Sequence, residues 1–215
     1  PLQVFGTIFQ ASPIGVMTLA SSPFESLADL RGEKIGIHAY NRDQLGMMLR
    51  SVGLDLSDVT PVVLHDDHHS LPAGAVAAQV AYVIDEKVAF ETAGHRVRVF
   101  AGRDHGYLAY SQVYYTSESN RAARPDALRA FLAASNRGWR AAIADPMATA
   151  QLVVSRYQPQ LQVAYQADSL RLIADLLFVE SGPASVGKMK KETWRQSPGA
   201  TPELVDALFA PIDKN

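Results

Sequence analysis

The first hundred residues alternate between short hydrophobic runs and polar stretches that contain glycine. The runs predict strands at residues 4–9, 14–19, 34–37, 59–64, 77–84 and 97–100. Helical spacing near residues 43–51 and 85–93 places helices between later strands. Strands that alternate with helices are typical of parallel pairing through crossover connections. The polar residues 10–13 separate the first two strands and predict a turn between them.

From Pro125 the hydrophobic spacing becomes helical. One apolar stripe is predicted on the first of these helices, formed by Leu128, Phe131, Leu132, Ser135, Trp139 and Ile143. Asp145 and Pro146 start a second helix that reaches residue 157, and further helices are predicted at 163–178 and 202–208. The chain therefore has an α/β first half and a helical second half.

Residues 22–37 predict a short helix, a tight turn and a buried strand. Ser26 is a candidate N-cap with Asp29 three residues on, and Gly32 ends the helix before the strand at 34–37. The polar segment 38–43 and the apolar run 45–49 follow that strand. Ligands of open α/β sheets bind where a strand, a polar loop and a helix follow one another in this way.

Composition excludes several kinds of chemistry. The 215 residues are 47% hydrophobic, enough for a core in one or two domains, and contain no cysteine. Thiol catalysis, zinc–thiolate sites and disulfides are excluded. The net charge of −2 and pI near 6.3 give no electrostatic reason to expect nucleic acid as a partner. No apolar run is long enough for membrane insertion, and the first residues lack the features of a signal peptide.

A resemblance to a known family rests on a succession of motifs. The segment DLRGEKIGI at 29–37 is similar to the opening of the second lobe in periplasmic substrate-binding proteins of ABC importers. The order of motifs resembles the branch that binds thiamine-pyrimidine precursors such as formylaminopyrimidine, which also includes fungal thiamine pyrimidine synthases. The other motifs are FQASP, GAVAAQVAYVIDE, YSQVYYTSE, ALRAFLAASNRGWRAAIADP and VGKMKKETWRQS.

The resemblance implies a type II periplasmic-binding-protein-like fold, in which two α/β lobes joined by crossing strands close on a small molecule. Residues 25–105 are expected to form the second lobe, and residues 1–24 and 106–215 the remainder of the first. Family members carry a further segment before VFGTIFQASP, so the first lobe is expected to be N-terminally incomplete, with an exposed sheet edge unless a partner covers it. Ala77 stands where the family usually has aspartate, so the contact made by that carboxylate is not expected here.

Position and resemblance together suggest ligand-binding residues. Tyr40 and Asn41 follow a predicted strand, and Tyr82 and Glu86 bracket the end of another, where an aromatic ring and a carboxylate suit an aminopyrimidine. An ordinary N-cap for Asn41 and a solvated first-turn acid for Glu86 are equally compatible with the sequence. The expected ligand-binding residues are Gln10, Ser12, Tyr40, Asn41, Tyr82, Glu86 and Tyr110.

Other motifs favour structural roles. The segment 65–69, His-Asp-Asp-His-His, has metal-ligand side chains but is predicted to be a solvated loop, so no metal site is expected. Asp104 and His105 lack a nucleophile motif beside them. Trp139 is expected in the core, and Trp194 is expected to pack against the last helix rather than on a ligand.

Three functional classes follow. The first is a periplasmic or otherwise extracytoplasmic solute-binding protein that delivers a small heteroaromatic metabolite to an ABC transporter permease, with no cofactor and as a monomer unless a partner covers the incomplete lobe. The second is an extracytoplasmic sensing domain of a signalling protein. The third, an enzyme similar to the pyrimidine synthases, is disfavoured because those enzymes use a cysteine-rich segment that this chain lacks.

Overall fold

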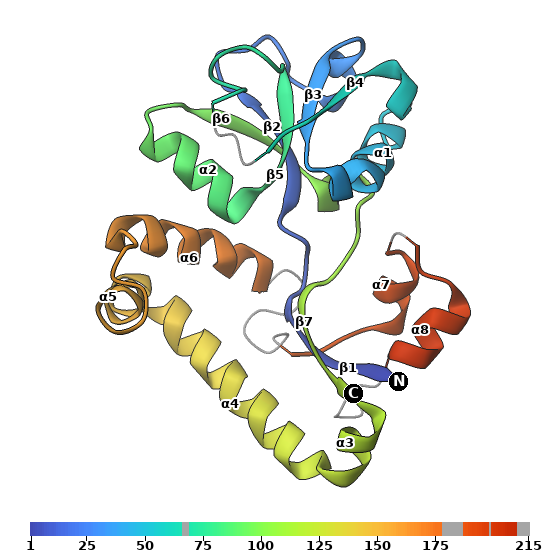
Figure 1. Cartoon of the computed structure of the whole chain (residues 1–215), viewed down its shortest axis with the longest axis vertical. Coiled ribbons are helices and arrows are strands. Elements are labelled where there is room, and N and C mark those ends of the chain that lie inside the picture. Colours follow the sequence, from blue (N-terminus) through green and yellow to red (C-terminus); the bar gives the residue numbers. More distant parts are fainter. Residues whose placement is uncertain (66–68, 178–186, 198, 210–215) are drawn as a thin grey trace. The chain divides into compact units, whose positions relative to one another are not determined.

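The computed structural model describes residues 1–65, 69–177, 187–197 and 199–209, and its contacts divide the chain into two units (Figure 1). Unit 1 comprises Pro1–Ser12 and Leu108–Asn215, and unit 2 comprises Pro13–Tyr107. The sequence placed the boundaries of the second lobe at residues 25 and 105. Residues 14–19 instead hydrogen-bond within the sheet of unit 2, so the contacts assign them to that unit.

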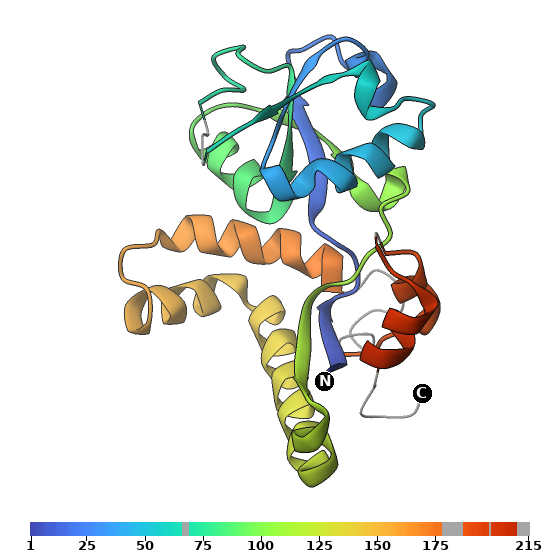
Figure 2. The same ribbon diagram turned by 45° about the vertical axis from the view of Figure 1, so that its right-hand side comes forward.

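Unit 2 is built on a five-stranded sheet with α1 (Arg42–Arg50) and α2 (Val83–Thr92) on opposite faces, as Figures 1 and 2 show. The order across the sheet is β4 (Thr60–Val63), β3 (Lys34–Ile37), β5 (Ala78–Tyr82), β2 (Ile14–Leu19) and β6 (Val97–Ala101). β4, β3 and β5 are parallel, and β2 is antiparallel to both β5 and β6. The prediction of parallel strands with crossover helices is therefore confirmed for this unit, apart from β2.

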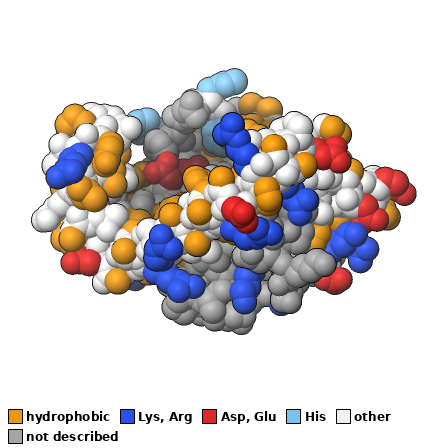
Figure 3. Space-filling view, turned by 90° about the horizontal axis from the view of Figure 1, so that it is seen from below, with side chains coloured by type: hydrophobic (Ala, Val, Ile, Leu, Met, Phe, Trp, Pro, Cys, Tyr) orange, Lys and Arg blue, Asp and Glu red, His pale blue; other side chains and the backbone are white. Residues whose placement is uncertain are grey.

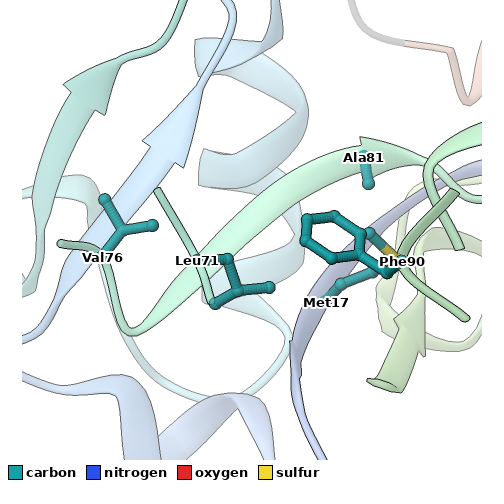
Figure 4. Close-up of a cluster of buried hydrophobic side chains, with 5 residues drawn as sticks. All are labelled: Met17, Leu71, Val76, Ala81 and Phe90. Atoms are coloured by element: carbon teal, nitrogen blue, oxygen red, sulfur yellow. The ribbon is translucent and has the colours of Figure 1, made fainter. Parts of the chain in front are cut away.

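One face of this sheet is closed by a cluster of buried side chains. Phe90 of α2 packs against Met17 of β2 and Ala81 of β5, together with Leu71 and Val76 (Figure 4). All five side chains are nearly inaccessible to solvent. Val83, seven residues before Phe90, also packs against this cluster, so this face of α2 lies on the sheet.

The segment before β3 folds much as its sequence predicts, although the helix is a short 3-10 helix, η1 (Leu27–Leu30). Asp29 Oδ2 accepts the backbone N–H groups of Ser26 at 2.7 Å and Glu25 at 2.8 Å. Gly32 then takes a left-handed conformation with φ of +84°, which reverses the chain into β3. Further 3-10 helices are η2 (Ala39–Asn41), η3 (Leu56–Asp58) and η4 (Gly102–His105).

Two expectations about strand ends were wrong. Residues 10–13 do not join two neighbouring strands, because β1 (Leu2–Phe9) pairs with β7 (Ser111–Ser117) while β2 lies in the other sheet. The predicted strand at 77–84 ends at Tyr82, since the N–H of Val83 donates to the carbonyl of Pro13 at 2.9 Å and α2 begins there. In both cases a contact with a distant segment overrides local preference.

Unit 1 contains the antiparallel pair β1–β7 and a series of helices (Figure 1). Phe5 of β1 and Leu132 of α4 form its buried cluster, with Tyr114 and Leu128 packed against them. The helices are α3 (Glu118–Ala123), α4 (Pro125–Ala144), α5 (Pro146–Arg156), α6 (Val163–Leu177), α7 (Lys191–Arg195) and α8 (Pro202–Leu208). The predicted helices after Pro125 are confirmed, and β7, α3 and α7 were not anticipated.

The apolar stripe of α4 is only partly covered. Of its 20 residues, Leu132 alone is buried, and Phe131 remains 49% exposed. A cleft of about 340 Å³ lies between α4, α5 and α6, lined mainly by apolar side chains that include Trp139 and Leu170. Trp139 also meets the ring of Phe9 edge-on at 6.2 Å, so its predicted packing role fits its contacts.

Candidate ligand-binding site

The carboxyl ends of the parallel strands in unit 2 meet at one edge of the sheet. β3 leads there into His38 and η2, and β5 leads into α2. The start of β2 lies at the same edge, where Ile14 pairs with Tyr82. Backbone groups at helix starts are free to bind a ligand at such an edge. Of the four expected site residues of unit 2, Tyr40 and Asn41 follow β3, Tyr82 ends β5, and Glu86 lies in α2.

Tyr40 presents its ring to solvent at this edge. Its exposed fraction is 75%, the highest among the large hydrophobic residues that the structure describes. The ring stacks on that of His38, with centroids 5.5 Å apart and an angle of 6° between the planes. An aromatic ring held flat on a neighbour and open on its other face can stack on a planar ligand.

Asn41 lies directly before α1 but does not cap it. Asn41 is 3% exposed, and its side chain makes no hydrogen bond to the first turn of the helix. The ordinary N-cap interpretation that the sequence left open is therefore wrong for the side chain. The capping role is excluded for this side chain, although the residue stands directly after Tyr40.

Tyr82 and Glu86 lie one turn apart at the start of α2. Tyr82 is the residue before the helix, and Glu86 is in its first turn; both are partly buried. Tyr82 ends β5 in a non-helical conformation, and Glu86 follows it in the first turn of α2. That the aromatic ring and the acid act together on a ligand stays a prediction.

The three expected residues of unit 1 lie on the segments that border β1 and β7. Gln10 and Ser12 follow β1 and are 7% and 6% exposed. The Gln10 backbone N–H donates to the carbonyl of Leu176 at 2.9 Å, and its side-chain nitrogen donates to the carbonyl of Lys188 at 3.1 Å. Tyr110 precedes β7, and its hydroxyl accepts the backbone N–H of Lys190 at 2.8 Å. The stretch 188–190 therefore contacts both Gln10 and Tyr110.

Two side chains of these regions were missed as site candidates. His38 was treated only as part of a polar loop, although its position directly after a strand could have pointed to it. Trp194 was assigned to packing, yet its ring lies 6.2 Å from that of Tyr110 and its indole N–H is buried without a partner. The sequence separation of 84 between these two positions hid their proximity.

The other chemistry-bearing motifs have structural roles or fall outside the site. Asp66, Asp67 and His68 lie outside the described residues, and the described part of the chain contains no group of three potential metal ligands. His105 Nδ1 lies 2.9 Å from the carbonyl of Ala101, and its ring packs edge-on against Phe100. These contacts tie His105 to its own turn.

Ala77 lies at the opposite edge of the sheet. Its N–H donates to the carbonyl of Lys34 at 2.9 Å, where β3 and β5 begin. It borders a separate cleft of about 390 Å³ whose lining also includes Lys34 and Leu71. The aspartate that the resemblance implies at this position would therefore sit away from the end of the sheet that carries Tyr40.

Resolved pKa shifts also lie away from the candidate site. The backbone N–H groups of Ser26 and Glu25 lower the pKa of Asp29 below its usual value. A hydrogen bond from Lys191 lowers the pKa of Asp206. Both carboxylates are exposed, so these shifts reflect a turn at Asp29 and an ion pair between α7 and α8 at Asp206.

The chain belongs to the NMT1/THI5-like family, whose model matches residues 1–149. It is 27% identical over 150 residues to the riboflavin-binding protein RibY of Chloroflexus aurantiacus, a match that covers 68% of this chain and 42% of RibY. The matched region thus spans under half the length of RibY.

The fold is that of periplasmic binding proteins. The aliphatic sulphonate-binding protein SsuA of Escherichia coli superimposes with a TM-score of 0.67 at 20% identity, covering 79% of this chain and 58% of SsuA. A sulfonate-binding SsuA of Methylobacillus flagellatus gives 0.69 at 15% identity, covering 98% of this chain and 66% of the other. The predicted α/β periplasmic-binding-protein-like fold is confirmed.

The same fold also occurs in an enzyme. DSZB, in complex with biphenyl-2-sulfinic acid, superimposes with a TM-score of 0.60 at 16% identity, covering 98% of this chain and 77% of DSZB. Similarity at this level of identity concerns the fold and leaves the chemistry to the residues of the site.

Proposed function

We propose that the protein is a solute-binding protein that captures a small planar heteroaromatic metabolite, of the kind represented by thiamine-pyrimidine precursors. The observation that carries the proposal is the exposed ring of Tyr40, stacked on His38 at the carboxyl edge of the sheet. Family membership and the relation to RibY support a ligand that is an aromatic heterocycle.

Each expected residue has a role suited to such a ligand. Tyr40 and Tyr82 offer rings for stacking, and the Glu86 carboxylate accepts hydrogen bonds from an exocyclic amine or a ring N–H. Asn41 offers both a donor and an acceptor. Gln10, Ser12 and Tyr110 contribute polar groups from unit 1. A ligand that binds one conformation of the protein more tightly than another shifts the equilibrium by that difference in affinity.

The biological setting is part of the proposal. The protein delivers its solute outside the cytoplasm to an ABC transporter permease and binds as a monomer, without a cofactor. No helix of the described residues is long and apolar enough to span a membrane. On the face shown in Figure 3, basic and acidic side chains are interspersed with hydrophobic ones, a distribution that does not resemble the basic stripe of a nucleic-acid-binding surface.

Binding without conversion is preferred over an enzymatic role. The sequence has no cysteine to serve as a nucleophile, and the imidazole of His105 is held by the turn that carries it. The relation to DSZB makes an enzyme the alternative that a turnover assay must address. Incubation with each bound compound should return it unchanged.

A thermal-shift screen tests the proposal. The panel contains formylaminopyrimidine, hydroxymethylpyrimidine, cytosine, thiamine and riboflavin, with taurine as a sulfonate and arginine as a non-aromatic solute. A compound that binds only the folded state at a hundredfold excess over its Kd stabilises that state by about 2.7 kcal/mol. We expect a rise in Tm with one or more of the heteroaromatic compounds.

Variants of the carboxylate separate the site from non-specific binding. Glu86→Gln should lower the affinity for the heterocycle about tenfold. Glu203→Gln, in the exposed first turn of α8, should leave the affinity unchanged. Stabilisation by taurine alone, or equal affinity of the two variants, would contradict the proposed ligand class or site.

A further inference from the structure

Trp194 carries a buried hydrogen-bond donor with no acceptor. The side chain is partly buried on α7, and its indole N–H is closed off from solvent without a partner in the structure. A buried N–H that has lost water and gained nothing costs free energy, so its retention in a folded protein calls for an explanation.

Packing alone does not account for an indole at this position. α7 contacts α8, and an ion pair between Lys191 and Asp206 already links the two helices. A phenylalanine would supply a ring of similar shape for the same packing without the unpaired donor. The contacts of α7 therefore do not explain why this position has an indole N–H.

Two neighbouring side chains also keep unused hydrogen-bonding capacity. The Tyr110 ring is 6.2 Å from that of Trp194, and its hydroxyl oxygen accepts from Lys190 while the hydroxyl hydrogen has no acceptor among the described residues. Gln10 donates through its side-chain nitrogen to Lys188, which leaves its amide oxygen without a donor within the described chain. Both bonds end on the stretch 188–190, close to α7 in sequence.

We infer that Trp194, together with Tyr110 and Gln10, forms a ligand subsite on unit 1 for a heterocycle whose edge places hydrogen-bond acceptors beside a donor. Trp194 Nε1–H and the Tyr110 hydroxyl donate, and Gln10 Oε1 accepts. An aminopyrimidine matches this set, because its ring nitrogens accept and its exocyclic amine donates. The inference rests on the proposed function and adds to it the unit 1 side of the recognition.

The chain offers a matched pair of variants, since Trp139 and Trp194 are its two tryptophans. Trp139 lines the apolar cleft of unit 1 and packs on Phe9. The experiment measures Tm without ligand for Trp194→Phe and Trp139→Phe, and the Kd by calorimetry for the panel compound that binds the wild type best.

We expect Trp194→Phe to lower the affinity for that compound about tenfold, while Tm without ligand stays unchanged or rises. Trp139→Phe should lower Tm and leave the Kd within twofold of the wild type. A Trp194→Phe variant that binds as tightly as the wild type overturns the inference and leaves the proposed function standing. A wild type that binds no heteroaromatic panel compound overturns both.

A second measurement serves if Trp194→Phe does not fold. In the Trp139→Phe chain, the single indole N–H signal in a proton–nitrogen NMR spectrum belongs to Trp194. Saturating ligand should move that signal downfield, as a new hydrogen bond requires. A signal that stays in place while calorimetry shows binding overturns the inference.

Discussion

The imidazole of His38 lies parallel to the phenol ring of Tyr40, with 5.5 Å between their centroids. The two residues are separated by a single position at the point where β3 gives way to η2. His38 therefore supports one face of an aromatic ring whose other face is open to solvent. The proposal of a binding surface for planar molecules in unit 2 rests on this pair.

Removing the Tyr40 ring should affect binding far more than folding. Tyr40→Ala is expected to lower the affinity for a heteroaromatic ligand by roughly two- to twelvefold, because a stacked aromatic pair is worth about 0.5–1.5 kcal/mol. Tm should stay within about a degree of the wild type, since surface substitutions usually change stability by less than about 0.5 kcal/mol. Calorimetry and thermal unfolding give the two quantities.

Tyr115→Ala is the control, because that ring is 63% exposed on β7 and lies outside the candidate site. It should leave the affinity unchanged. Equal weakening by both substitutions would show that Tyr40 has no specific part in binding.

Two fully buried threonines should respond in opposite ways to loss of the hydroxyl. Thr18 Oγ1 has no hydrogen-bond partner in the described structure, whereas Thr7 Oγ1 lies 3.1 Å from the carbonyls of both Phe9 and Ser111. Thr18→Val should stabilise unit 2 by about 1 kcal/mol, and Thr7→Val should destabilise unit 1 by a similar amount. Urea denaturation measures both, and a loss of stability in Thr18→Val would mean that the hydroxyl has a partner.

Two glycine-to-alanine substitutions should also differ in sign. A Cβ on Gly102 would lie 2.7 Å from the carbonyl oxygen of Ile14, so Gly102→Ala should destabilise by about 1–3 kcal/mol. A Cβ on Gly138, in the middle of α4, would meet nothing within 4 Å, so Gly138→Ala should stabilise by about 1 kcal/mol. Thermal unfolding of the two variants checks the order, and a stable Gly102→Ala would show that β2 and η4 can separate at no cost.

Stability should depend on the Asp29 carboxylate at acid pH. Its pKa in the folded chain lies below the value of 3.8 expected when unfolded, because the Ser26 and Glu25 N–H groups favour the charged form. The contribution is therefore complete above pH 3.8 and is lost as the pH falls through the folded pKa. Asp29→Asn should lower Tm near neutral pH, and the difference from the wild type should vanish in strong acid.

Glu33→Gln provides the comparison for that pH series, since Glu33 follows the same turn without accepting those backbone groups. Its Tm difference from the wild type should be small and nearly independent of pH. A constant difference for Asp29→Asn across the series would contradict the assigned cause of the shift.

Local chemistry made several elements predictable from sequence. The strand at Lys34–Ile37 is framed by Gly32 and by a polar segment, and the structure begins and ends it at the predicted residues. Pro125 and Pro146 stand in the first turns of α4 and α5, where proline is compatible with a helix. These signals act within a few residues, so they do not depend on contacts with distant parts of the chain.

Signals that depend on distant segments were the ones missed. Val83 and Ile84 are β-branched and prolong an apolar run, yet the Pro13 carbonyl takes the Val83 N–H and the helix begins there. The strand β7 has no buried residue, so its half-exposed pattern gave little indication of pairing with β1.

The candidate site divides in the same way. The position of Tyr40 and Asn41 after a strand follows from local sequence, and so does that of Tyr82. The connection of Gln10 and Tyr110 through residues 188–190 spans 178 and 80 positions. No local pattern encodes such a connection, and Trp194 was assigned to packing for that reason.

The insertion of unit 2 between β1 and β7 bears on the order of folding. The Thr7–Ser111 contact closes a loop of 104 residues, and the entropy lost on closing a flexible loop increases with its length. β2 and β6 are neighbours in the sheet, with Gly15 opposite Ala101, so a folded unit 2 already draws the two ends of that loop together. The β1–β7 ladder should therefore form after the five-stranded sheet, and conditions that unfold unit 2 should slow its reassembly.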